Sequence, residues 1–188
     1  MNNKNIPQTG RIGRFARILE TKANQETFEK IMINSPDYNA FKAEQKAEWW
    51  KNAVEKLEKE LGKDAALEVM RTCGSKCCGA GQRKTAKHLM AEATSLKVFL
   101  EKFVNYGVKN GALEYEIIDD STFITKHNKC FCGQVKKSKE LFKTNTYCQC
   151  SVEFNKQFFE AAFERPVQVK LNKSILNGDK WCEFEIKH

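Results

Sequence analysis

Residues 147–186 read YCQCSVEFNKQFFEAAFERPVQVKLNKSILNGDKWCEFEI, and they contain the clearest secondary-structure pattern in the chain. Apolar side chains recur every three or four residues over Val152–Phe163, which predicts a helix. Val167–Ile175 and Trp181–Ile186 alternate polar and apolar residues, which predicts two strands. The Asn177-Gly178 pair between them is a strong hairpin-turn signal. We therefore expect one helix followed by an antiparallel pair of strands.

A second strand pair is predicted upstream of this stretch. Leu113–Ile118 and Thr122–Thr125 are short β-rich segments, and Asp119-Asp120 between them favours a turn. Before them, apolar residues follow helical spacing against a charged background. The predicted helices are one or two over residues 12–32, one from Ser35 to about Leu61 that Gly62 ends, one from Asp64 to about Cys73, and one from about Arg83 to Tyr106.

These elements predict an α+β fold, in which a helical N-terminal half packs on a C-terminal antiparallel sheet with one long helix. We divide the chain into a flexible lead-in (residues 1–11), a helical region (12–110) and a cysteine-rich α+β region (111–188). The length of 188 residues suits one domain, so the last two regions are expected to be continuous.

Composition limits the class of protein. The first ten residues are polar, and no apolar stretch approaches the roughly 20 residues of a membrane helix, so we expect a cytoplasmic protein that does not span a membrane. The net charge of +8 is partly local, because residues 126–143 hold six lysines and one acid. That segment matches no helix-turn-helix or base-stacking motif, so a solvated loop is favoured over nucleic-acid binding. A homodimer is left open.

Eight cysteines in a reducing compartment favour metal binding or thiol chemistry over disulfides. Residues two apart in an extended segment point to one face, so Cys130-Phe131-Cys132 and Cys148-Gln149-Cys150 can together supply four thiolates. Four thiolates suit a tetrahedral zinc ion. The predicted metal ligands are therefore Cys130, Cys132, Cys148 and Cys150, with Cys182 either an alternate ligand or a small buried apolar residue.

The segment Cys73–Gly79 raises a separate question about reactivity. Its glycines should interrupt a helix, so Cys73 and Cys77 are predicted to form part of a ligand pocket wall. Nearby lysines and arginines would favour a thiolate at Cys77 or Cys78, which makes these two the candidate catalytic nucleophiles. The alternative is a glycine-rich turn between helices whose cysteines pack inward. His127 and His188 could assist a metal, but we expect both to face solvent.

Residues 147–186 also resemble a known family. Tyr147-Cys148-Gln149-Cys150, Phe163–Val167 and Ser174–Ile186 are similar to the small-molecule-binding domain named after bacteriochlorophyll 4-vinyl reductase, and to its bacterial relatives labelled L-2-amino-thiazoline-4-carboxylic acid hydrolase-like. The resemblance implies an α+β domain that encloses an apolar pocket, and a ligand sensor in some members.

The resemblance also implies a zinc site. In the aromatic-sensing members, zinc is held by a cysteine before the helix, a glutamate and a cysteine in the next strand, and a cysteine after the glycine turn. Cys148 and Cys182 match the first and last of these positions, whereas Leu171 and Ser174 occupy the middle two. A metal in this chain must therefore recruit Cys150 or the pair Cys130 and Cys132, or be absent.

Three functions follow from these features. The preferred hypothesis is a cytosolic sensor or carrier that binds a small, partly apolar or anionic molecule beside a structural thiolate-metal site. The second is a hydrolase of a small cyclic amide or thiazoline, with Cys77, Cys78 or a metal-bound water as nucleophile. The third is a zinc-stabilised nucleic-acid binder attracted by the positive charge.

Overall fold

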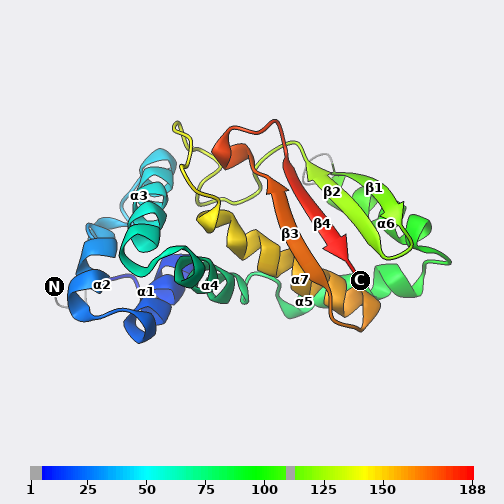
Figure 1. The fold of residues 1–188 in the computed structure, drawn as a ribbon, viewed down its shortest axis with the longest axis horizontal. Helices are drawn as coiled ribbons and strands as arrows, with labels where there is room; N and C mark the ends of the chain where they lie inside the picture. The colour runs from blue at the N-terminus through cyan, green and yellow to red at the C-terminus, as the bar shows by residue number, and fades with distance from the viewer. Residues whose placement is uncertain (1–5, 109–112) are drawn as a thin grey trace.

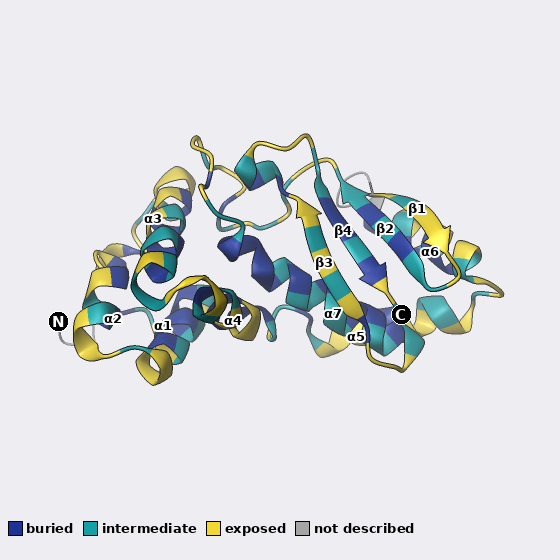
Figure 2. Cartoon of the chain, viewed as in Figure 1, coloured by how far each residue is buried: buried dark blue, intermediate teal, exposed yellow. Residues whose placement is uncertain are grey.

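Four antiparallel strands form one sheet in the C-terminal half. The structure, a computed structural model, describes residues 6–108 and 113–188. The strands are β1 (Leu113–Asp119), β2 (Thr122–His127), β3 (Gln168–Lys173) and β4 (Cys182–Lys187), arranged in the order β1-β2-β4-β3. Each neighbouring pair is antiparallel. Both predicted strand pairs are confirmed, and Figure 2 shows that the central strands are more buried than the edges.

The connection between β3 and β4 is longer than a tight hairpin. Strand β3 ends at Lys173, before the predicted end at Ile175, because Ser174 caps a short 3-10 helix, η4 (Ile175–Asn177). The Ser174 hydroxyl accepts a hydrogen bond from the amide of Leu176. Gly178 then adopts a φ of 99°, a left-handed conformation that glycine tolerates. This cap fixes Ser174 beside the start of α7.

Helices α5 (Ala80–Ala91), α6 (Leu96–Val108) and α7 (Gln149–Phe163) accompany the sheet. In Figure 1, α7 runs from the helical half to a position behind strands β3 and β4. The prediction of one helix from Arg83 to Tyr106 is wrong, because α5 ends at Ala91 and α6 begins at Leu96. Ser95 starts a new helix by accepting a hydrogen bond from the amide of Val98.

The N-terminal half is helical, as predicted. It comprises α1 (Gly10–Lys22), α2 (Gln25–Ile31), the 3-10 turn η2 (Ser35–Asp37), α3 (Ala43–Leu61) and α4 (Lys63–Gly74). The predicted helix from Ser35 to Leu61 is instead η2 followed by α3, because the intervening segment turns the buried ring of Tyr38 towards the indoles of α3. Gly62 ends α3 as expected, with a φ of 80°.

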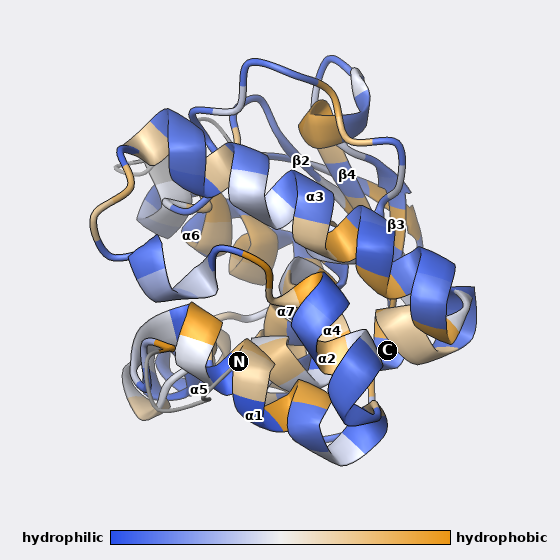
Figure 3. Ribbon diagram, turned by 90° about the vertical axis from the view of Figure 1, so that its left-hand side faces the viewer, coloured by the Kyte–Doolittle hydropathy of each residue, from blue (hydrophilic) through white to orange (hydrophobic). Residues whose placement is uncertain are grey.

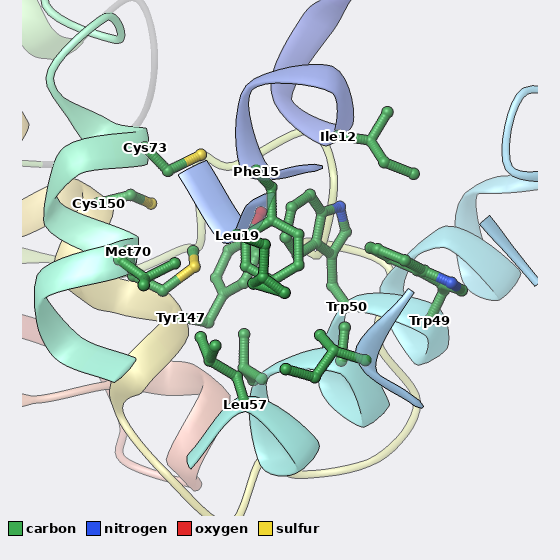
Figure 4. Close-up of a cluster of buried hydrophobic side chains, with 14 of the residues drawn as sticks. Ile12, Phe15, Leu19, Trp49, Trp50, Leu57, Met70, Cys73, Tyr147 and Cys150 are labelled. Carbon is green, nitrogen blue, oxygen red and sulfur yellow. The ribbon is translucent and has the colours of Figure 1, made fainter. Parts of the chain in front are cut away.

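The first core lies between α1, α3 and α4. Phe15 and Trp50 are fully buried, with ring centroids 5.1 Å apart. Figure 4 shows Cys73 and Cys150 at one edge of this core, near Phe15. In Figure 3, α3 presents mostly hydrophilic residues on its outer side. A second core joins the sheet to α5, α6 and α7.

Helices α4 and α7 approach each other closely at Gly74. A Cβ atom at Gly74 would lie 2.6 Å from the Cα and the carbonyl oxygen of Cys150. Only glycine fits such a contact without a backbone shift. This contact fixes Cys150 against the helical half.

The architecture is therefore α+β, with the predicted helical half, antiparallel sheet and long helix. Of the predicted lead-in, residues 1–5 lie outside the described residues, while Ile6 is buried and α1 already includes Arg11. No helix within residues 6–108 and 113–188 combines the length and apolar character needed to cross a lipid bilayer.

Candidate functional site

A cavity of about 770 Å³ lies where the helical half meets the sheet. Its walls come from α1, α6, α7, β2, β4 and the connection over residues 128–136. The volume falls within the range of about 300 to 1,000 Å³ typical of small-molecule sites. The described residues that line it include Arg11, Lys129 and Lys136 but no carboxylate.

One wall of the cavity is aromatic. Phe103 comes from α6, Phe154 and Phe158 from α7, and Phe184 from β4. The rings of Phe103 and Phe158 have centroids 5.3 Å apart, and those of Phe154 and Phe158 are stacked at 6.3 Å. Such a wall can bury the apolar body of a ligand.

The cavity lining also holds a cation surrounded by sulfur atoms. Arg11 donates hydrogen bonds from Nη1 to the Cys132 Sγ and the Tyr147 hydroxyl, both at 2.9 Å, and to the Cys150 Sγ at 3.5 Å. Its Nη2 donates to the Cys77 Sγ at 3.2 Å. We call Cys77, Cys132 and Cys150 the Arg11 thiol group.

Burial determines the charge of several groups here. It raises the pKa of Cys150 to about 12 and that of Tyr147 well above its ordinary value, so both are protonated at neutral pH. Burial disfavours the charged form of Arg11, but a guanidinium in a protein keeps its proton at neutral pH. The guanidinium therefore remains charged.

A second set of thiols faces a hydroxyl and an amide. The Sγ of Cys148 lies 3.2 Å from the Oγ of Ser174, and the amide of Ile175 donates to the Cys182 Sγ at 3.5 Å. Cys130 lies close enough to interact electrostatically with both thiols. Burial raises the pKa of Cys148 well above its ordinary value and that of Cys130 to about 11. We call Cys130, Cys148 and Cys182 the Ser174 thiol group.

His127 lines the cavity at the end of β2, opposite Cys182 in the strand register. Both ring nitrogens are buried without a hydrogen-bond partner in the described residues. The ring packs against Phe131 and Phe184, and burial lowers its pKa to about 4. The expectation that His127 faces solvent is wrong, because β2 extends to this residue. His188 is also partly buried, with its ring stacked on Phe163.

Comparisons with known proteins place the chain in a family. The model of a family of unknown function, DUF6144, matches residues 14–188. The chain belongs to this family. No curated protein matches the sequence.

Solved structures share only weak similarity with this DUF6144 chain. The phenol-responsive sensory domain of the transcription activator PoxR is 15% identical, with a TM-score of 0.46, over 76% of this chain and 73% of its own. A structure concerned with H-NOX activation is 12% identical, with a TM-score of 0.42, over 94% and 93%. Another, concerned with heme redox potential and porphyrin distortion, is 12% identical, with a TM-score of 0.41, over 94% and 97%. These likenesses carry no argument about the ligand.

The four predicted zinc ligands are divided between the two thiol groups of this DUF6144 chain. Because α7 begins at Gln149, Cys148 and Cys150 are not in an extended segment, and helical geometry directs them to different sides. Cys148 contacts Ser174, whereas Cys150 and Cys132 contact Arg11. Within the described residues, no three His, Cys, Asp or Glu side chains form a group that could hold a metal ion.

The positions that the family resemblance implied are partly brought together. Cys148 and Ser174 are in contact, and Cys182 lies beside them with Cys130. Leu171 packs instead as an apolar side chain. As they lie, these residues do not form a metal-binding arrangement. Zinc remains a prediction.

The three cysteines of the segment Cys73–Gly79 have different surroundings. Cys77 lines the cavity, whereas Cys73 is buried with its Sγ 3.8 Å from the Arg11 carbonyl oxygen. Cys78 is buried in the second core, and burial raises its pKa, contrary to the expected activation. Besides Arg11, Arg14 contacts Cys77, with its Nη2 at 3.6 Å from the Sγ.

Sequence reasoning missed Arg11, Tyr147 and His127 as site residues. One signal for Arg11 was present, since Arg11, Phe15 and Leu19 recur every four residues and share a helix face. An arginine that shares a helix face with apolar residues is predicted to direct its charged group towards the protein interior. Tyr147 and His127 carry no comparable signal, because their roles depend on elements distant in sequence.

Proposed function

We propose that this DUF6144 chain binds a small organic molecule in the cavity and acts as a sensor or carrier. The proposal rests on a cavity of about 770 Å³ whose lining combines phenylalanines with Arg11 and several thiols. Ligand sites commonly combine apolar walls with a few fixed polar groups. The resemblance to the 4-vinyl reductase type of domain points to the same class.

His127 supports this proposal. Its two buried nitrogens lack hydrogen-bond partners in the described residues, although they belong to a ring that lines the cavity. A buried polar group left unpaired costs about 1 to 3 kcal/mol. A ligand that donates to or accepts from His127 would recover part of that cost.

A variant that fills the cavity tests the proposal. Ser151 lies on α7 and lines the cavity, so Ser151→Phe should exclude a ligand. We expect the neutral fluorophore phenylnaphthylamine to bind the wild type and to bind Ser151→Phe at least tenfold more weakly. Gln157→Phe, on the same helix but outside the cavity lining, is the control and should keep wild-type affinity. Absence of binding to the wild type would contradict the proposal.

A thiol-dependent hydrolase remains the second candidate because Cys77 lines the cavity and contacts two arginines. The substrate class, a small cyclic amide or thiazoline, comes from the resemblance alone. If Cys77 is the nucleophile, iodoacetamide at neutral pH should modify Cys77 well before the buried Cys78. The rates are measured by peptide mass spectrometry, and equal or reversed rates would contradict the role of Cys77 as the nucleophile.

A structural zinc ion is also proposed, with Cys130, Cys148 and Cys182 as the nearest set of thiols. Binding would require these side chains to move together and lose their protons. Protein purified without a chelator should contain about one zinc per chain, and Cys148→Ser should lose it. A folded wild-type protein without zinc would refute this part. Cytoplasmic location and a homodimer remain predictions.

A further inference from the structure

The charged side chains among the described residues that line the cavity are all positive. Arg11, Lys129 and Lys136 line it, and the described lining residues include no aspartate or glutamate. The two lysines lie at the solvent-exposed side of the cavity, whereas the guanidinium of Arg11 is half-buried among side chains of the interior. No described carboxylate forms an ion pair with Arg11. A buried cation without an anion is costly.

The hydrogen-bond acceptors that Arg11 has are weak. Three of them are sulfur atoms, and the fourth is the hydroxyl of Tyr147. Thiol sulfur is a poor acceptor, and a guanidinium has five donors in a planar fork that matches the two oxygens of a carboxylate. An anion at this position would replace weak acceptors with strong ones.

The aromatic wall adds a second requirement. Phe103, Phe154, Phe158 and Phe184 can bury an apolar or aromatic body, but they cannot hold a charge. A small inorganic anion would leave that wall empty, and a neutral hydrocarbon would leave Arg11 unpaired. The walls therefore complement a molecule with one anionic end and one apolar end.

We infer that the ligand is an organic acid, with a carboxylate or similar anionic group bound by Arg11 and an aromatic or apolar body against the phenylalanines. This inference rests on the proposed function and assigns the ligand class of the same cavity. It also assigns Arg11 as the residue that selects for charge. A metal cation cannot occupy the same place, because the guanidinium would repel it.

Two fluorophores that differ in one anionic group test the inference. Anilinonaphthalene sulfonate and phenylnaphthylamine share an aromatic skeleton, but only the first carries a negative charge. Their affinities are measured for the wild type, Arg11→Gln and Arg11→Lys. The control is Arg17→Gln, because Arg17 is exposed on the same helix and, within the described residues, hydrogen-bonds only the backbone of Gln8.

Arg11→Gln should weaken sulfonate binding about tenfold or more and leave binding of the neutral probe within about twofold. Arg11→Lys should restore part of the sulfonate affinity, because it keeps the charge. Arg17→Gln should change neither. The inference is overturned if Arg11→Gln weakens the binding of both probes equally or of neither. It is also overturned if Arg11→Lys restores none of the sulfonate affinity.

If Arg11→Gln does not fold, Arg11→Lys and the wild type still decide. The sulfonate should then bind Arg11→Lys more weakly than the wild type. This loss of affinity should be larger than the loss measured for the neutral probe. Equal ratios would mean that Arg11 is already neutralised, for example by a thiolate of Cys77 or Cys132. Failure of the neutral probe to bind the wild type refutes the proposed function, whereas failure of selectivity for charge refutes only this inference.

Discussion

The two thiol groups line the same cavity but differ in what they contact. Cys77, Cys132 and Cys150 surround the charged guanidinium of Arg11. Cys148 contacts the hydroxyl of Ser174, and Cys182 accepts a hydrogen bond from a backbone amide. One thiol group therefore surrounds a charge, and the other contacts neutral groups.

The spacing of the cysteines in the sequence does not determine which residues they contact. Cys148 and Cys150 are two residues apart, yet the start of α7 between them places them in different groups. Cys77 and Cys150 are far apart in sequence, yet both contact Arg11. The two thiol groups should therefore respond differently to changes in packing and in charge.

The largest effect is expected at Gly74, where α4 meets α7 behind Cys150. Gly74→Ala introduces a Cβ that would lie 2.6 Å from the Cys150 backbone, so the helices must separate. We expect a loss of about 3 kcal/mol in the free energy of unfolding, measured by urea denaturation. Gly81→Ala is the control, because a Cβ there meets no atom within 4 Å. It should be neutral or stabilising, since alanine favours helices.

If Gly74→Ala is as stable as Gly81→Ala, the close contact of α4 with α7 does not exist. The position of Cys150 beside Arg11 would then be wrong, and the division between the two thiol groups would fail with it.

A smaller effect is expected from the charge of His127, which lies beside Cys182. Burial lowers the pKa of His127 from its ordinary value of 6.5 to about 4, so the unfolded chain binds a proton that the folded chain excludes. His127 should therefore destabilise the fold as the pH falls from about 6.5 to about 4. The stability of His127→Phe relative to wild type should rise by about 2 kcal/mol over this range.

The measurement is urea unfolding of both proteins at matched pH values. Carboxylates also titrate in this pH range, but they are common to the two proteins, so their contributions cancel in the difference. A difference independent of pH would show that the surroundings of His127 tolerate a cation, as those of Arg11 do.

The sequence predicts which helices and strands form better than it predicts the residues at which they begin and end. The strands and α7 follow from alternation and helical spacing over Leu113–Ile118, Val152–Phe163 and Trp181–Ile186. The break between α5 and α6 could not be seen in the apolar stripe, because a local cap at Ser95 decides it. The end of β3 likewise depends on Ser174.

The site could be predicted only in outline. The convergence of cysteines on one region followed from their number and clustering, and Cys130, Cys132, Cys148, Cys150 and Cys182 all line the cavity. Their division could not be predicted, because it depends on where α7 begins. The role of Arg11 depends on packing between α1 and residues more than a hundred positions away.

The smallest effect is expected at Ser174, whose hydroxyl is the partner of Cys148 in the Ser174 thiol group. Ser174 is buried, and its Oγ accepts a hydrogen bond from the Leu176 amide and lies 3.2 Å from the Cys148 Sγ. Ser174→Ala should lower the free energy of unfolding by about 1 kcal/mol, because the cap of η4 is lost. The loop variant Ser138→Ala, at a partly exposed position, should stay within about 0.5 kcal/mol of wild type. Unchanged stability of Ser174→Ala would mean that Cys148 has no hydroxyl partner, and the contrast between the two thiol groups would rest on Arg11 alone.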